Sequence, residues 1–212
     1  MPPSPSLAPG NDHRSTAVLW CNLGSPDAPT ASAVRSYLAD FLGDPRVVEI
    51  PRLLWLPILH GIILRVRPAK SAAKYASIWL PEGSPLKVWS ERQAQRLGDM
   101  LGRRGHRVAV RDAMRYANPS IGARLDALQA EGVERVLVLQ GYPQYSATTT
   151  ASVIDAVNDW SRAQRSVPEF RFVNQFHDDP GYIEALARRI EAHWQDEGRG
   201  EVLRLSFHGI PA

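Results

Sequence analysis

The side chains best suited to chemistry gather where strands are expected to end. A tyrosine-rich segment, Tyr142–Ser146, follows one expected strand, and Arg115 and Tyr116 follow another. His177 and His208 lie at the ends of two more. Because ligands in open α/β sheets bind beyond the carboxyl ends of the strands, we expect these groups to share one edge. The set is aromatic and hydrogen-bonding, and it lacks the acidic cluster that hard metal ions need.

An imidazole at such an edge suits proton transfer or metal binding. His208 lies in Ser206-Phe207-His208-Gly209, and its side chain has an ordinary pKa of about 6.5. A neutral ring could therefore accept a proton near working pH, or it could ligate a transition metal. The alternative interpretation is a structural histidine at a strand end. The residues by themselves leave these roles open.

The loop after the first expected strand argues against a nucleotide. The chain contains no G-x-G-x-x-G and no G-x-x-x-x-G-K-[ST] pattern. In the run Gly24–Pro29, two prolines remove backbone donors, and Asp27 puts a negative charge where a phosphate would lie. A mononucleotide-binding protein of flavodoxin type therefore remains only as a competing hypothesis.

The elements that must position these groups alternate between strands and helices. Apolar runs predict strands at residues 16–23, 107–114, 135–139, 170–173 and 201–207. Helical periodicity predicts a helix capped by Thr30 and ended by Asp44-Pro45, with others at about 71–79, 87–103, 119–132, 147–164 and 180–196. The run at 135–139 is typical of a strand buried on both faces. This alternation predicts an α/β fold with a mainly parallel sheet.

The most apolar segment, Leu53–Leu64, has an ambiguous environment. Its twelve residues lie between Arg52 and Arg65, whereas a membrane-spanning helix needs about 20. The segment could lie in a membrane surface or line an apolar pocket. A helix buried in the protein is the more ordinary alternative.

Composition excludes several classes of protein. Of the 212 residues, 44% are hydrophobic and 22% charged, which is typical of a globular protein rather than a disordered one. A single cysteine, Cys21, excludes an intrachain disulfide and a cysteine-rich zinc site. The net charge of +3 is too small to predict a nucleic-acid partner. Residues 1–15 hold four prolines and no secretory signal pattern, and we expect a disordered tail there.

Five motifs in order resemble the ferrochelatase family, from about Ala17 to the last residue. The motifs are Asn22–Pro26, Glu82–Pro85, Met114–Tyr116, Tyr142–Thr149 and Ser206–Gly209. The sequences of these motifs are most similar to those of bacterial members of the family. The resemblance implies a lyase that inserts Fe²⁺ into protoporphyrin IX during haem synthesis. It also implies a chelatase-like (Rossmann-like) three-layer α/β/α fold, built from two similar halves with the porphyrin between them.

The resemblance also implies a set of site residues. His208 matches the histidine at the metal-insertion centre, as the catalytic and metal-binding residue. Arg67, Tyr75 and Ser84 match positions that contact the porphyrin, with Arg67 and Ser84 toward its propionates. Leu23 and Tyr142 match positions that line the pocket.

The sequence departs from the family pattern in two ways, which concern the extent of the domain and an iron–sulfur cluster. The chain ends at Ala212, four residues after His208, whereas the family continues into a second half that supplies an essential glutamate. We therefore expect an N-terminal ferrochelatase domain over residues 16–212, with 201–212 opening the second domain. Ala147 stands where some members carry an iron–sulfur cysteine, so no cluster and no permanently bound cofactor are expected.

The remaining expectations concern the cellular location of the protein, its partners and an alternative function. We expect a cytoplasmic protein that binds no nucleic acid and that contacts a membrane peripherally through residues 53–64. The alternative function is a non-catalytic tetrapyrrole-binding module, since the glutamate partner of His208 is absent from this chain.

Overall fold

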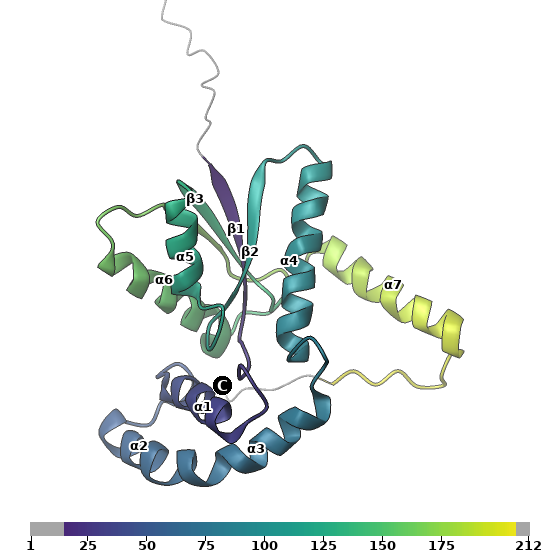
Figure 1. The fold of residues 1–212 in the computed structure, drawn as a ribbon. Coiled ribbons are helices and arrows are strands. Elements are labelled where there is room, and N and C mark those ends of the chain that lie inside the picture. The colour runs from purple at the N-terminus through teal and green to yellow at the C-terminus, as the bar shows by residue number, and fades with distance from the viewer. Residues whose placement is uncertain (1–14, 207–212) are drawn as a thin grey trace, which may run out of the picture. The chain divides into compact units, whose positions relative to one another are not determined.

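The computed structural model describes residues 15–206 (Figure 1). The chain divides into two compact units, Met1–Gln175 and Phe176–Ala212. The predicted tail, residues 1–15, lies outside the described residues except for Ser15, whose carbonyl accepts hydrogen bonds from the backbone of Glu134 and Arg135.

The first unit is built on a four-stranded parallel sheet. Its strands are β1 (Thr16–Asn22), β2 (Val108–Met114), β3 (Arg135–Gln140) and β4 (Glu169–Val173), in the order β2-β1-β3-β4. Asn22 pairs with Met114, and Cys21 pairs with Gln140. Because the strands run in parallel and end in register, the loops that follow them meet at one edge, as the sequence predicts.

Helices cover both faces of the sheet, so the predicted three-layer α/β/α arrangement is confirmed. Helix α4 (Pro85–Arg103) packs on β2, while α5 (Ile121–Ala130) and α6 (Ser152–Ala163) lie on the opposite side (Figure 1). Apolar side chains of α5 and α6 form a buried core with the strands, among them Leu125, Leu128 and Val157. Strand β3 is fully buried on one face only and half-buried on the other, because α4 covers mainly β2.

A group of helices lies at the carboxyl edge of the sheet. It consists of α1 (Ala31–Gly43), α2 (Arg52–Ile58), the π-helical turn η1 (Leu59–Ile63) and α3 (Leu64–Ile78). Thr30 caps α1 by accepting a hydrogen bond from the backbone N–H of Ala33, at 3.3 Å, as predicted. The prediction that a helix starts near residue 71 is wrong, because α3 already begins at Leu64.

Helix α3 continues through Pro68 because of a contact with α1. A proline inside a helix lacks the N–H that would bond to the carbonyl four residues earlier. That carbonyl belongs to Leu64, and it accepts a hydrogen bond from Arg35 Nε at 3.0 Å instead. Since its orphaned acceptor is satisfied from α1, the helix continues through the proline.

The second unit contains α7 (Pro180–Glu197), whose N-terminus is capped by Asp179. The strand expected at 201–207 is not formed over residues 201–206. A strand needs a neighbour to satisfy its backbone, and no strand of the described chain pairs with this segment. Phe207 lies outside the described residues.

Candidate functional site

The loop after β1 is bound to the loop after β2. The backbone N–H groups of Arg115 and Tyr116 donate to the carbonyls of Asn22 and Leu23, at 2.8 and 2.9 Å. Gly24 adopts a φ of +99°, and a Cβ there would lie 1.8 Å from the Tyr116 carbonyl oxygen. Only glycine allows so close an approach at this backbone angle. The position of Leu23 is therefore set by the segment that follows β2.

Three of the predicted porphyrin-binding residues come together around Tyr37 of α1. Tyr75 of α3 packs edge-on against Tyr37, with 6.5 Å between the ring centroids. Tyr142 lies near enough to raise the pKa of Tyr37, and the backbone of Leu23 in turn lowers the pKa of Tyr142. Leu23 and Tyr75 pack against the same apolar cluster as Tyr37. The structure thus brings together residues that the sequence separates widely.

The phenols of this cluster are all neutral near neutral pH. Burial is the main cause that raises the pKa of Tyr37, Tyr75 and Tyr142 above the ordinary value of a tyrosine. Neutral phenols present apolar ring faces and hydrogen-bonding hydroxyls, which suit the flat, apolar face of a ring-shaped ligand.

Ser84 is buried, and its hydroxyl has local partners. It caps α4 by accepting a hydrogen bond from the backbone N–H of Lys87, at 3.3 Å, and it is hydrogen-bonded to the hydroxyl of Ser25. Ser25 follows Leu23 and Gly24, so the start of α4 is tied to the loop after β1. Only 2% of Ser84 is exposed.

Arg67 lies on α3 and is exposed to solvent. The structure shows no polar partner for it among residues 15–206, so its guanidinium is available to a carboxylate. Eight residues separate Arg67 from Tyr75, which corresponds to about 12 Å along a helix axis.

His208 lies outside the described residues. Within residues 15–206, no group of three or more His, Cys, Asp or Glu side chains could hold a metal ion. The predicted catalytic and metal-binding role of His208 therefore stays a prediction.

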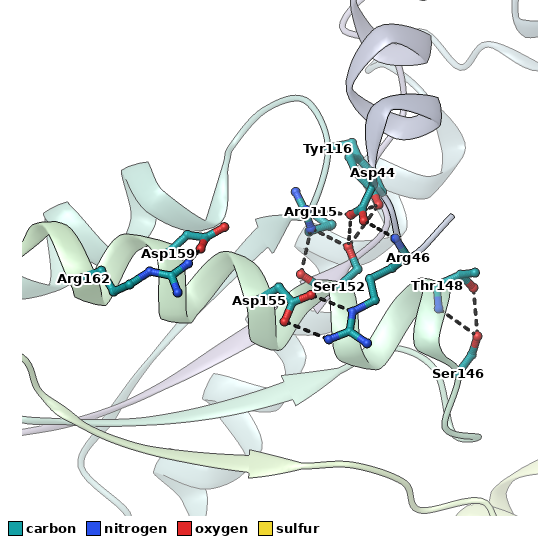
Figure 2. Close-up of polar contacts among 10 residues, drawn as sticks. All are labelled: Asp44, Arg46, Arg115, Tyr116, Ser146, Thr148, Ser152, Asp155, Asp159 and Arg162. Carbon is teal, nitrogen blue, oxygen red and sulfur yellow. Dashed lines mark hydrogen bonds and ion pairs between the residues drawn. The ribbon is translucent and has the colours of Figure 1, made fainter. Parts of the chain in front are cut away.

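A buried polar cluster beside these tyrosines was not identified from the sequence (Figure 2). The carboxylate of Asp44 accepts hydrogen bonds from Arg115 Nη2 and the Tyr116 hydroxyl, both at 2.7 Å, and from the Ser152 hydroxyl at 2.6 Å. Its second oxygen accepts the backbone N–H of Arg46 at 2.7 Å. Polar residues at a helix end and at the start of another carry no sequence signal that they will meet.

The pKa of Asp44 lies below the ordinary value of an aspartate. Burial would raise it, but hydrogen bonds from Ser152, Tyr116 and the Arg46 backbone outweigh that effect, together with the charge of Arg115. Asp44 is thus an ionised carboxylate held among four donors.

A cavity of about 730 Å³ opens beside this cluster. Its lining includes Tyr37, Asp44, Arg115 and Tyr116, together with Asp40 and Arg52. None of the predicted porphyrin-binding residues lines it. Its volume lies within the range of about 300–1,000 Å³ that is usual for small-molecule sites.

Comparison with known proteins decides the family. The family model for ferrochelatase matches residues 15–212. The chain belongs to the ferrochelatase family. The ferrochelatase of Polaromonas sp. (strain JS666 / ATCC BAA-500) is 62% identical over 212 residues, covering 99% of this chain and 58% of the relative. That of Methylibium petroleiphilum (strain ATCC BAA-1232 / LMG 22953 / PM1) is 64% identical over 209 residues, covering 99% and 57%.

The match extends to more distant members of the ferrochelatase family. The ferrochelatase of Bordetella pertussis (strain Tohama I / ATCC BAA-589 / NCTC 13251) is 51% identical over 207 residues, which is 98% of this chain and 56% of that protein. The chain thus spans somewhat more than half the length of the curated ferrochelatases it matches. The family resemblance on which the site residues were assigned is confirmed.

Proposed function

We propose that this chain carries the porphyrin-binding part of a ferrochelatase. A ferrochelatase inserts Fe²⁺ into protoporphyrin IX to form protohaem. The observation that carries the proposal is the convergence of Leu23, Tyr75 and Tyr142 around Tyr37 at the carboxyl edge of a parallel sheet. Family membership supports the activity, and the neutral, aromatic side chains support binding of a flat, apolar ring.

The residues of the chain suit distinct parts of that reaction. Leu23 and the neutral phenols would hold the macrocycle in an apolar environment, and Arg67 would pair with a propionate. Metal insertion releases two pyrrole N–H protons for each Fe²⁺ that enters. His208, by resemblance, either accepts a proton or ligates the incoming iron.

The proposal is tested by anaerobic metallation. Purified chain is mixed with protoporphyrin IX and Fe²⁺, or Zn²⁺ as a stable surrogate, and absorbance is followed. Metalloporphyrin formed above the uncatalysed rate would show a working site. Porphyrin binding without metallation would mean that the chain is the ligand-binding part of a ferrochelatase and acts by itself only as a non-catalytic tetrapyrrole-binding module. Absence of porphyrin binding would contradict both.

The role of His208 is tested by His208→Ala in the longest form of the protein that metallates porphyrin. We expect loss of metallation with porphyrin affinity nearly unchanged, because the imidazole acts on the metal or the proton rather than on ring binding. His177→Ala is the matched control, and it should retain activity. Turnover by His208→Ala at the wild-type rate would remove His208 from the mechanism.

We further propose that the chain needs no iron–sulfur cluster. Clusters are usually held by four cysteine thiolates, and Cys21 is the single cysteine of the chain. Cys21 is fully buried in β1, and burial raises the pKa of its thiol. Ala147, at the position where some relatives carry a cluster cysteine, begins the π-helical turn η2 (Ala147–Ala151) before α6.

We also propose peripheral contact with an anionic membrane through α2, η1 and the start of α3, in an otherwise cytoplasmic protein. The ordinary alternative, a buried helix, is wrong for much of this segment. Leu53 is 92% exposed and Leu54 64%, and Ile58 and Ile62 are also exposed. No helix among residues 15–206 has the length and apolar character needed to cross a bilayer.

The charge around this apolar surface favours anionic lipid. No Asp or Glu occurs between Ile50 and Pro81, whereas this stretch holds five cationic side chains: Arg52, Arg65, Arg67, Lys70 and Lys74. All five are exposed. Each Lys or Arg near an anionic surface contributes about 1 kcal/mol to binding.

A further inference from the structure

Tyr116 supports both sides of the predicted porphyrin pocket. Its backbone N–H donates to the carbonyl of Leu23 at 2.9 Å, and its own carbonyl abuts Gly24. Its ring packs edge-on against Tyr37 and Phe41, with centroids 6.4 and 5.3 Å away. Through Tyr37 the ring supports Tyr75, and through its backbone it supports Leu23. A small movement of Tyr116 would therefore displace both walls.

The position of Tyr116 depends in turn on Asp44. The Tyr116 hydroxyl donates to the carboxylate of Asp44 at 2.7 Å, inside a cluster that also contains Ser152 (Figure 2). The guanidinium of Arg115 lies over the Tyr116 ring, 4.6 Å from its centroid, and donates to the same carboxylate. The ring is thus held at its hydroxyl by Asp44 and at its face by a cation that Asp44 also anchors.

Asp44 is suited to positioning rather than to proton transfer. Both carboxylate oxygens accept hydrogen bonds, from four donors in all. The residue is only 6% exposed. A carboxylate whose oxygens are already occupied by donors makes a poor acceptor for a substrate proton, but it orients its donors strongly.

We propose that Asp44 is a positioning residue of the porphyrin site. It holds the Tyr116 hydroxyl, so that Tyr116 fixes Leu23 through its backbone and Tyr75 through Tyr37. This inference rests on the proposed function, because it concerns the affinity of the same pocket for porphyrin. Preorganised walls raise affinity because less conformational freedom is lost on binding.

The test measures protoporphyrin IX affinity of the 212-residue chain by fluorescence titration. Asp44→Asn removes the charge, and Tyr116→Phe removes only the hydroxyl while it keeps the ring. Val157→Ala is the matched control, since Val157 is fully buried in the other core, between the sheet and α6. All variants are compared at a temperature where circular dichroism shows each to be folded.

We expect Asp44→Asn to weaken porphyrin binding by about ten-fold or more and Tyr116→Phe by about three-fold or more. Val157→Ala should lower the melting temperature but keep the wild-type affinity. The Soret maximum of the bound porphyrin should also move toward its position in buffer in the first two variants only, which a general loss of stability would not cause.

Two results would overturn the inference alone. One is wild-type affinity in both Asp44→Asn and Tyr116→Phe, and the other is an equal loss of affinity in Val157→Ala. Failure of the unmodified chain to bind protoporphyrin would instead overturn the proposed function, and the inference with it. The two failures are therefore distinguished by the wild-type titration.

Discussion

At the scale of residues, Gly24 allows the loop after β1 to lie directly against the backbone of Tyr116. Its φ of +99° and the 1.8 Å that would separate a Cβ from the Tyr116 carbonyl leave no room for any other residue. We expect Gly24→Ala to lower the free energy of unfolding by about 2–4 kcal/mol, through strain and overpacking. Urea unfolding measures this change.

The matched control for that substitution is Gly102→Ala. Gly102 lies in α4, and a Cβ there would meet no atom within 4 Å. Since alanine favours helix over glycine by up to about 1 kcal/mol, this variant should be as stable as the wild type or slightly more so. Equal stability of the two variants would contradict the steric account of Gly24.

Asp44 should make stability depend on pH in a predictable direction. Because its folded pKa lies below the unfolded value near 3.8, its contribution is fully present above that value and is lost as pH falls through the folded pKa. Near pH 7, Asp44→Asn should lower the free energy of unfolding by about 3 kcal/mol, since it leaves Arg115 without its buried partner.

Denaturant unfolding between pH 7 and pH 3 measures the Asp44 contribution. The difference between wild type and Asp44→Asn should stay constant down to about pH 5 and shrink below about pH 4. Asp155→Asn is the control, because the Arg46–Asp155 pair is exposed and contributes at most about 1 kcal/mol. A difference that grows as the pH falls would contradict the assignment of an ionised Asp44.

At the scale of elements, Ser84 at the start of α4 is both a helix cap and a predicted porphyrin contact. Ser84 caps this helix and is hydrogen-bonded to Ser25. Ser84→Ala should lower the free energy of unfolding by about 1–2 kcal/mol, because a cap and a buried partner are both lost. If Ser84 also contacts a propionate, as the family resemblance implies, porphyrin affinity should fall as well.

Ser120→Ala separates these two effects of Ser84. Ser120 caps α5 by accepting a hydrogen bond from the backbone N–H of Ala123, at 3.2 Å, and it is not a predicted porphyrin contact. Ser120→Ala should lower the free energy of unfolding by about 1 kcal/mol, because only a cap is lost, with no change in porphyrin affinity. A Ser84→Ala variant that behaves in the same way would restrict Ser84 to a capping role.

At the scale of the molecule, the exposed apolar surface of α2 predicts a measurable affinity for lipid. We expect the chain to co-sediment with vesicles that contain phosphatidylserine, less with neutral vesicles, and less at high salt. The double variant Leu53→Ser, Leu54→Ser should weaken binding by about ten-fold or more, because the buried apolar area falls.

The matched control for lipid binding is the double variant Leu203→Ser, Leu205→Ser in the second unit. These two leucines are 51% and 67% exposed, but they lie outside the cationic stretch. This variant should bind vesicles as the wild type does. If both double variants lost binding alike, the contact would be a general effect of exposed leucines rather than a property of α2.

Much of the architecture follows from local patterns in the sequence. The apolar runs identify all four strands of the sheet, and the cap Thr30 marks the start of α1. These predictions succeed because strand and helix periods are properties of short segments. Three of the predicted porphyrin contacts, Leu23, Ser84 and Tyr142, lie in family motifs that can be read for the same reason, since each motif is a short run of residues.

Other features depend on how the segments pack. Asp44 and Ser152 are 108 residues apart and share a hydrogen bond, and Tyr37 belongs to an ordinary apolar helix stripe until α3 places Tyr75 against it. Periodicity specifies which face of a helix is apolar, but not which polar atoms meet across elements. The helix through Pro68 likewise depends on Arg35, a residue of another element. Strands, helices and motifs are thus encoded locally, whereas the network that supports the pocket arises only when distant donors and acceptors are packed together.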